Sequence, residues 1–515
     1  MAVSSAVVLG LGAVVLVWFA IVHFTRIKMD PREPPLIEPT IPLFGHIIGM
    51  LREGPLYFAK ISAKTKSPII TLQMVTGRTY VVKSPIVAAQ VQRASSTLSF
   101  AKLVIEVAPR MALMDVAGRN IMNGENGTKR SIGVMHDIIP PRLTPQNMEP
   151  EGTIQLQHFA DFLNRMPKEG LQTDLFKMLT RQVTLASMHT FYGPENPMAM
   201  HPELVEDFWN WENGVVGIIV GILPQYTTRK TYVSLEKVVN GFVEYFQNNR
   251  IEKAATMINL RWKEHVAMGL NIEQQARLEL GMCLGINVNA AITCFWAFNS
   301  ICSRPSLLAE VREEIQNHAL VDNNTISFRA IRDSCPLLNS IFRETMRITS
   351  PLSSARYVVE DTIIADTYLL RKDTVVQISG SLLHTDKEIW GPDAATFNPY
   401  RFLYTPSGTK SAPDGSGAIV NSKADQVHHA AYRSFGGGSS LCPGRHFAQM
   451  EILALTAAML TGFELVPPEG QSEVKWNPKT NEKQFPLASL KPIRPLEVKV
   501  QRRKGWEDVE WVIKF

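Results

Sequence analysis

The segment FGGGSSLCPGRHFA, residues 435–448, places one cysteine between a glycine-rich stretch and an apolar run. Glycines lack a Cβ, so they let the backbone take up strained dihedrals and pass close to a flat ligand. A helix that begins just after Cys442 offers a positive dipole and free N–H groups, which lower the pKa of a thiol. Phe435 can cover the sulfur from the other side. The pattern predicts a turn that presents a thiolate, then a helix from Pro443 to Leu460 that Gly462 stops; its glycines are Gly436, Gly437, Gly438 and Gly444.

The other cysteines offer no competing site. Cys283, Cys294, Cys302 and Cys335 form no Cys-x-x-Cys pair, and the chain has no His-Glu-x-x-His helix, so no zinc site is expected. Five cysteines in 515 residues are too sparse for a disulfide framework, which indicates a reducing compartment. By itself, a lone cysteine such as Cys442 can also be a buried structural residue.

The overall charge is weak. Residues of the hydrophobic class make up 45% of the chain and charged residues 20%, which is typical of a folded globular protein. A formal net charge of +5 over the whole chain does not favour nucleic acid, so no nucleic-acid partner is expected.

The N-terminus carries an uncharged apolar run from Val3 to Phe24. As a helix of about 22 residues it would span roughly 33 Å, which matches a bilayer core. A cleaved signal peptide is the alternative, but the run lacks a basic segment before it, and Arg26 and Lys28 follow it. We therefore predict a retained transmembrane anchor at residues 1–25, with the rest of the chain on the cytosolic side.

Five prolines follow the anchor in DPREPPLIEPTIPLFGH and favour stiff extended backbone. This segment predicts a linker over residues 26–45. Beyond it the chain shows no second linker and no repeat, which indicates a single catalytic domain over residues 46–515.

Periodicity predicts a mainly helical domain with small sheets. The segment from Pro68 to Pro85 has two β-rich runs around a turn at residues 76–78, and 363–380 is again rich in β-branched residues. Apolar residues recur at helical intervals over 152–192, 230–250, 272–318 and 329–348.

Three further motifs occur in a fixed order. Glu344-x-x-Arg347 places an acid and a base on one helix face, and Arg401 follows in GPDAATFNPYRF. The third is Pro351-Leu-Ser-Ser-Ala-Arg356. With Phe435, Gly438, Cys442 and Gly444, these motifs resemble those of the cytochrome P450 family over the C-terminal third to half of the chain, and the anchor resembles that of its membrane-bound class.

This resemblance implies a P450 fold preceded by a transmembrane helix, and haem b with Cys442 as axial ligand to the iron. It further implies that Glu344, Arg347 and Arg401 form a structural triad and that Arg356 binds a haem propionate. It also implies a single-pass protein of the endoplasmic reticulum membrane with a cytosolic catalytic domain, which receives electrons from NADPH through a flavoprotein reductase.

The chain departs from the family pattern at Ser440, where most members carry a basic residue that pairs with a propionate. Arg356, and more remotely Lys129 or Arg130, are the candidates for this countercharge.

A second departure lies in GMCLGINVNAAITCFWAF, the helix expected to cross the distal face of the haem. Aligned on Trp296, Gly285 comes first, and Val288 and Asn289 stand where the family carries an acid and a threonine that together supply protons. An amide donates and accepts hydrogen bonds but titrates poorly, so Asn289 is the candidate catalytic residue. The pattern resembles the branch that includes the sterol 7-alpha-hydroxylases and prostacyclin synthase, which also carry asparagine there.

We therefore expect a haem-thiolate monooxygenase that oxidises a lipophilic terpenoid or steroid-like molecule in secondary-metabolite or sterol biosynthesis. The alternatives are a haem-thiolate isomerase or dehydratase that needs no reductase, and a non-catalytic haem-binding protein. Substrate contacts are expected from residues 100–117, from the distal helix near Asn289 and Thr293, and from residues 352–355.

Overall fold

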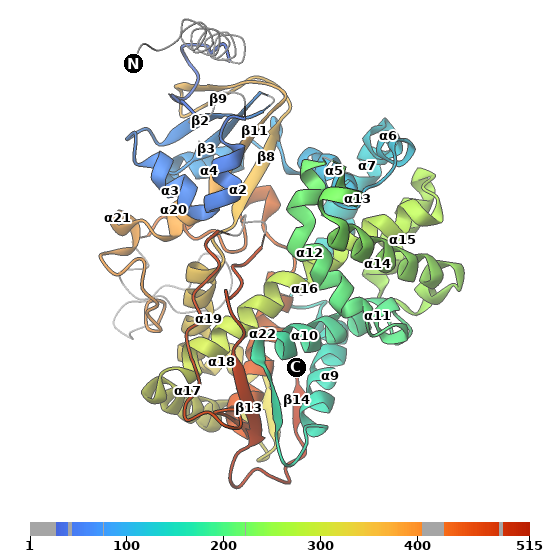
Figure 1. The fold of residues 1–515 in the computed structure, drawn as a ribbon, viewed down its shortest axis with the longest axis vertical. Coiled ribbons are helices and arrows are strands. Elements are labelled where there is room, and N and C mark those ends of the chain that lie inside the picture. The colour runs from blue at the N-terminus through green and yellow to red at the C-terminus, as the bar shows by residue number, and fades with distance from the viewer. Residues whose placement is uncertain (1–26, 40–43, 76, 222, 404–426, 484–487) are drawn as a thin grey trace, which may run out of the picture.

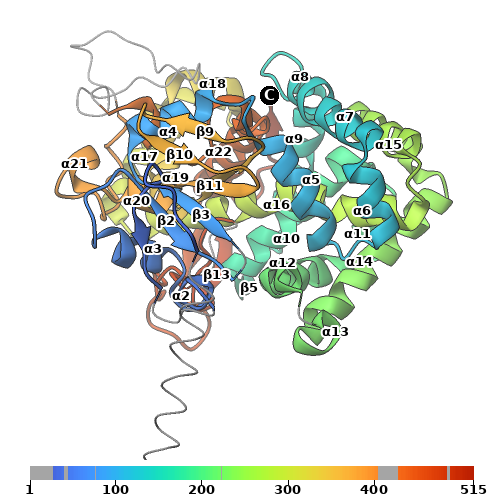
Figure 2. The same ribbon diagram turned by 90° about the horizontal axis from the view of Figure 1, so that it is seen from above.

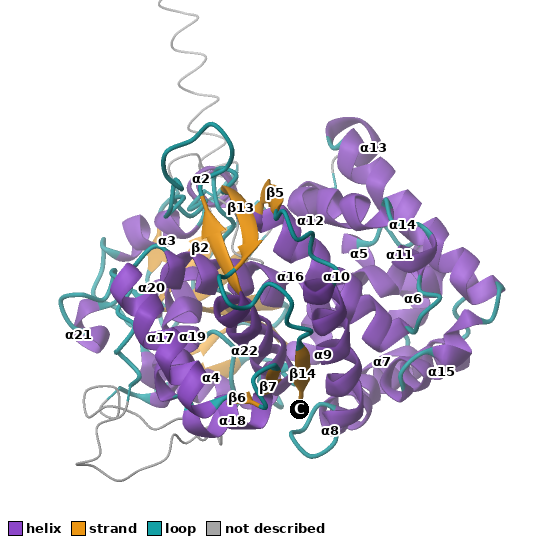
Figure 3. Ribbon diagram, turned by 90° about the horizontal axis from the view of Figure 1, so that it is seen from below, coloured by secondary structure: helices purple, strands orange, loops and turns teal. Residues whose placement is uncertain are grey.

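A computed structural model describes residues 27–39, 44–75, 77–221, 223–403, 427–483 and 488–515. Helices dominate it, as Figure 3 shows, and the strands form small sheets, which confirms the predicted fold class for the domain. The predicted anchor at residues 1–25 lies outside the described residues. One described helix, α16 (Ile272–Cys302), is long and apolar enough to span a membrane, but most of it is buried inside the molecule.

The largest sheet has the strand order β1-β2-β3-β11-β8-β4. Its strands are β1 (Leu36–Ile37), β2 (Ile69–Gln73), β3 (Arg78–Val82), β11 (Thr374–Ser379), β8 (Ser353–Val358) and β4 (Leu98–Ser99). The predicted hairpin is confirmed, because β2 and β3 pair antiparallel with Ile69 opposite Val82. Pro68 precedes β2, and Pro85 is the first residue of α4 (Pro85–Arg93), where its missing N–H costs nothing.

The proline-rich segment packs on this sheet. Strand β1 pairs parallel with β2, and Glu33 is buried where it accepts hydrogen bonds from Arg78 and, at 2.7 Å, from the Tyr80 hydroxyl. The extended backbone that the prolines favour thus supplies an edge strand.

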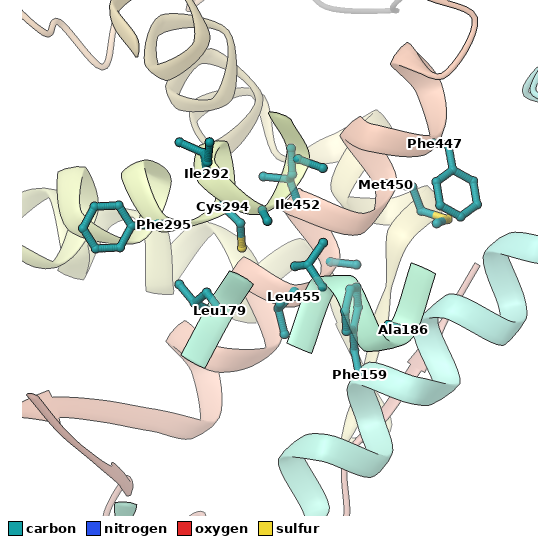
Figure 4. Packing of buried hydrophobic residues seen from close by; sticks show 14 of the residues in the cluster. Phe159, Leu179, Ala186, Ile292, Cys294, Phe295, Phe447, Met450, Ile452 and Leu455 are labelled. Atoms are coloured by element: carbon teal, nitrogen blue, oxygen red, sulfur yellow. The ribbon is translucent and has the colours of Figure 1, made fainter. Parts of the chain in front are cut away.

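The helical core is built around α16, which runs through the middle of the molecule (Figure 1). It packs against α10 (Leu175–Tyr192), α14 (Arg229–Gln247) and α22 (Arg445–Gly462). Asn271 and Gln274 form a capping box that satisfies the first N–H groups of α16. Figure 4 shows the packing that holds the centre, with Leu179, Cys294 and Leu455 from three helices facing one another.

Three of the predicted helical stretches are interrupted, and one of them, 329–348, divides into α18 (Phe328–Ser334) and α19 (Pro336–Thr349). Stretch 152–192 holds α9 (Glu149–Asn164) and α10, with β5 (Leu171–Asp174) between them, and 272–318 holds α16 and α17 (Pro305–His318). Pro305 begins α17 because proline fits the first turn of a helix and not its interior.

Helix α22 begins at Arg445 and ends at Gly462, each two residues later than the predicted bounds Pro443 and Leu460. The reason for the glycine differs from the expected cap. A Cβ at Gly462 would lie 2.5 Å from Cζ2 of Trp511, so the missing side chain makes room for that ring. The chain continues directly into β12 (Phe463–Val466).

The remaining helices and strands pack around the largest sheet and the core helices. Helices α6, α7 and α15 lie on the side of the molecule away from the largest sheet, and α5 lies between them and strand β8 of that sheet (Figure 2). The other helices are α2 (Ile47–Glu53), α3 (Pro55–Ser62), α5 (Phe100–Met111), α6 (Val116–Asn123), α7 (Glu125–Gly133), α8 (Ile139–Arg142), α11 (Pro197–Met200), α12 (Leu204–Val220), α13 (Pro224–Thr227), α15 (Thr256–Met268), α18 (Phe328–Ser334), α19 (Pro336–Thr349), α20 (Gly380–His384) and α21 (Lys387–Trp390). The other strands are β6 (Leu320–Val321), β7 (Thr325–Ser327), β9 (Thr362–Ile364), β10 (Tyr368–Leu370), β13 (Glu497–Arg502) and β14 (Val512–Lys514).

Candidate functional site

A cavity of about 720 Å³ lies between α16, α5 and the loop that precedes α22. Its wall is mostly apolar, as in ligand pockets of this size. Each of the three regions expected to contact substrate contributes to it: Phe100, Leu103 and Val107 from α5, Asn289 from α16, and residues 352–355. Thr293 is the exception, because it is fully buried in the core and does not line the cavity.

Other lining residues come from segments that no sequence motif indicated. Val216 and Ile219 reach the cavity from α12, and Ile47 and Leu51 from α2. They are ordinary apolar positions of amphipathic helices, and only the tertiary arrangement brings them to one wall.

The cysteine loop presents Cys442 to this cavity together with Phe435 and Gly444. The backbone N–H of Cys442 donates to the carbonyl oxygen of Phe435 at 2.8 Å, which closes the loop. Gly436 has a φ of +76°, and a Cβ there would lie 2.8 Å from the carbonyl oxygen of Ser440, so the turn requires glycine. Gly438, which we expected near the cofactor, packs instead against Gln92 of α4 and does not line the cavity.

The pKa of the Cys442 thiol is raised, whereas the sequence predicted that it would be lowered. Burial raises the pKa of Cys442, while the N–H of Gly444 and the charge of Arg445 act in the opposite direction. Desolvation wins because α22 begins only at Arg445, so Cys442 lies ahead of the helix N-terminus. A bound metal ion would favour the thiolate directly.

Asn289 is half-buried in the cavity wall, and its amide orientation is set by a contact 200 residues away. Its Oδ1 accepts hydrogen bonds from the backbone N–H of Ser489 at 2.9 Å and from the Ser489 hydroxyl at 3.2 Å. That hydroxyl also lies 2.6 Å from the hydroxyl of Ser350. The backbone N–H can only donate, so Oδ1 is the atom that faces Ser489, and Nδ2 is left as a donor. The neighbouring Val288 is buried in the hydrophobic core.

The structure brings the predicted triad together. Glu344 accepts two hydrogen bonds of 2.8 Å from Arg347 and two of 3.1 and 3.2 Å from Nε of Arg401. All three side chains are at least nine-tenths buried. Arg347 also donates to the carbonyl oxygen of Ala394, so the triad connects α19 to the segment after α21. None of the three lines the cavity, which fits a structural role.

Arg356 is buried on β8 beside the cysteine loop. Its guanidinium donates to the Ser440 hydroxyl and, at 3.3 Å, to the carbonyl oxygen of Gly437. The other candidates for the countercharge lie elsewhere, since Arg130 pairs with Glu264 at 2.7 Å and Lys129 is exposed on α7. Arg433, which no sequence motif indicated, also lines the cavity, and its Nε has no hydrogen-bond partner among the residues that the structure describes.

These residues fit the haem that the motifs imply. Cys442 offers a sulfur at the cavity wall, Gly436 and Gly444 keep side chains away from it, and Arg433 presents a buried, incompletely bonded cation. Among the described residues, no group of three or more histidine, cysteine, aspartate or glutamate side chains forms an alternative metal site.

Comparison with known proteins agrees with this site. The family model for cytochrome P450 matches residues 34–500. The cytochrome P450 monooxygenase nodJ of Hypoxylon pulicicidum is 31% identical, over 94% of this chain and 93% of its own length. Cytochrome P450 7A1 of Oryctolagus cuniculus is 27% identical over 57% of this chain and 58% of its own. The solved structure of retinoic acid-bound cyanobacterial CYP120A1 has the same fold, with a TM-score of 0.68 at 16% identity, over 92% of this chain and 99% of its own. The chain, with its cysteine loop at one wall of an apolar cavity, therefore belongs to the cytochrome P450 family and is a monooxygenase of that family.

Proposed function

We propose that this monooxygenase oxidises a lipophilic, terpenoid or steroid-like molecule, with Cys442 as the axial ligand of haem b. The observation that carries the proposal is the cavity of about 720 Å³, which joins Cys442 to a mostly apolar wall. Part of this volume would be taken by the haem, and the mostly apolar wall suits a lipophilic molecule better than a polar metabolite, because few polar groups are available to replace lost hydration. The resemblance to nodJ, a fungal relative, supports a role in secondary metabolism, and that to cytochrome P450 7A1 keeps a sterol pathway as an alternative.

The bound haem would supply the oxidation chemistry, and the chain would supply binding, orientation and exclusion of water. Phe100, Leu103 and Leu352 would hold the substrate by apolar contact. Asn289 would hold a hydrogen-bond acceptor at the cavity wall through its Nδ2, since Ser489 occupies its oxygen. An amide neither takes nor gives a proton readily, so a proton would have to reach the site through water.

Electrons would come from NADPH through a flavoprotein reductase, as the family resemblance implies. We further propose residues 1–25 as a single-pass anchor in the endoplasmic reticulum membrane, residues 26–45 as the linker and residues 46–515 as the cytosolic catalytic domain. Deletion of residues 1–25 should release the protein from the membrane fraction, and full retention of the truncated chain there would contradict the anchor.

A second candidate activity of the same cavity, beside mono-oxygenation, is the isomerisation or dehydration of an already activated substrate. It is favoured by Asn289 and Val288, which leave α16 without an acidic residue at the cavity wall. Such a reaction would need neither reductase nor dioxygen.

The test is a set of parallel incubations of the purified full chain with a lipophilic extract of its host. One has reductase, NADPH and isotopically labelled dioxygen, one omits reductase, and one uses Cys442→Ala. A product that carries the label only in the complete mixture supports the monooxygenase. Turnover without reductase identifies the second candidate, and no product in any mixture would contradict a lipophilic substrate from the host.

A further inference from the structure

Two buried arginines lie side by side next to the cysteine loop. Arg356 on β8 and Arg433, two residues before Phe435, each expose 1% of their surface. Both contact Gly437, because Nη2 of Arg356 donates to its carbonyl oxygen at 3.3 Å and a Cβ on Gly437 would lie 2.7 Å from Nη1 of Arg433. The loop that carries Cys442 therefore has two guanidinium groups along one edge.

Neither charge is neutralised by the protein. Among the described residues, the partners of Arg356 are the Ser354 and Ser440 hydroxyls, backbone carbonyl oxygens and the ring of Phe100, with no carboxylate. In the described part of the chain, the guanidinium of Arg433 has the amide oxygen of Gln92 as its hydrogen-bond acceptor, and its Nε has no partner. By contrast, the equally buried Arg347 has Glu344.

Unpaired buried charges are costly, and these two also repel each other. Burial, followed by the nearby charge of Arg356, lowers the pKa of Arg433 to about 10. Burial likewise lowers the pKa of Arg356 to about 10. Both groups still carry a proton at neutral pH, so the folded site holds two positive charges that only an anion can offset.

The position of the pair identifies this anion. Arg433 lines the cavity on the same loop as Cys442, and Arg356 does not line it but directly follows Ala355, which does. Haem carries two propionates on one edge. We propose that Arg433 binds one haem propionate, next to the Arg356 that the family resemblance assigns to the other, so that Arg433 replaces the basic residue that the family carries where this chain has Ser440. The proposal rests on haem binding and is independent of the substrate.

The surroundings of Arg433 hold it in place for this role. Its backbone N–H donates to Nε2 of His384 at 2.7 Å, and Nδ1 of His384 faces the carbonyl oxygen of Arg347 at 2.9 Å. His384 is thus neutral and connects the loop to the triad. Gln92 holds the far side of the guanidinium, and Ser440, with its short side chain, turns its hydroxyl to Arg356.

Haem transfer tests the proposal with a readout other than activity. The full chain and its Arg433→Gln variant are each loaded with haem or with haem dimethyl ester, and release to excess apomyoglobin is followed by absorbance. Loss of a charge-assisted hydrogen bond predicts that Arg433→Gln releases natural haem about tenfold to a hundredfold faster than the unaltered chain. With the dimethyl ester, whose propionates carry no charge, the two proteins should differ by much less.

Arg343→Gln is the matched control, because Arg343 on α19 lies over the ring of Phe402 at 4.5 Å and does not line the cavity. It should release haem at the unaltered rate. If Arg433→Gln does not accumulate with haem, Arg433→Lys serves in its place, with a smaller acceleration that again depends on free propionates. Equal release of natural haem by the Arg433 variant and the unaltered chain, or an equal acceleration with haem and its ester, would overturn the proposal, because the second result indicates a purely structural role.

Discussion

Glu344 provides the sharpest test of how the fold around the cysteine loop is held. It is fully buried and accepts hydrogen bonds from Arg347, from Arg401 and from the backbone N–H of Asn398 at 2.9 Å. Glu344→Gln keeps the shape but removes the negative charge, so the buried guanidinium of Arg347 loses the carboxylate that it pairs with, while Arg401 keeps Asp393 at 2.8 Å. Breaking a buried ion pair in this way costs about 3–5 kcal/mol, because an uncompensated charge remains in the interior.

The assay is urea-induced loss of the long-wavelength band of the reduced, carbon-monoxide-bound protein. The variant should lose this band at a clearly lower urea concentration, or should fail to retain haem. The matched control is Asp508→Asn, which removes an ion pair of similar length, 2.6 Å to Lys168, at a position where both side chains are about four-fifths exposed. Solvent screens that pair, so no measurable change is expected. A Glu344→Gln protein that is as stable as the control would refute the reasoning from burial.

Three further predictions concern separate parts of the site. Cys442→Ala should abolish the long-wavelength band, and its persistence would show that another residue supplies the axial ligand. Burial, followed by the charge of Arg347, lowers the pKa of His384 to about 3, so the unfolded chain takes up a proton below about pH 6.5 while the folded chain does not. Stability should therefore fall as pH drops from 6.5 towards 3, by about 2 kcal/mol at pH 5 from this group, and a His384→Gln variant with the same pH dependence would contradict it. Gly462→Ala should destabilise the protein by about 1–3 kcal/mol through contact with Trp511, which thermal unfolding can measure, and an unchanged midpoint would show that the ring moves freely.

Local patterns explain why much of the fold could be predicted. The hairpin of β2 and β3, the triad spacing Glu344-x-x-Arg347 and the helix after Cys442 each depend on residues close together in the chain. Their boundaries were less accurate where tertiary contacts compete. Strand β5 interrupts a helical stretch because it pairs with β13, more than 300 residues away.

The sequence by itself determined the family and the position of the cysteine loop. Both follow from short motifs, and the spacing of residues within a motif does not depend on how the rest of the chain packs. Only the tertiary structure decided which polar groups act together. It joined Arg433 to Arg356, and Asn289 to Ser489, across 77 and 200 positions respectively. The physical reason is that the energy of a buried charge or amide depends on neighbours in space, and those neighbours are brought together only when the helices and the sheet pack.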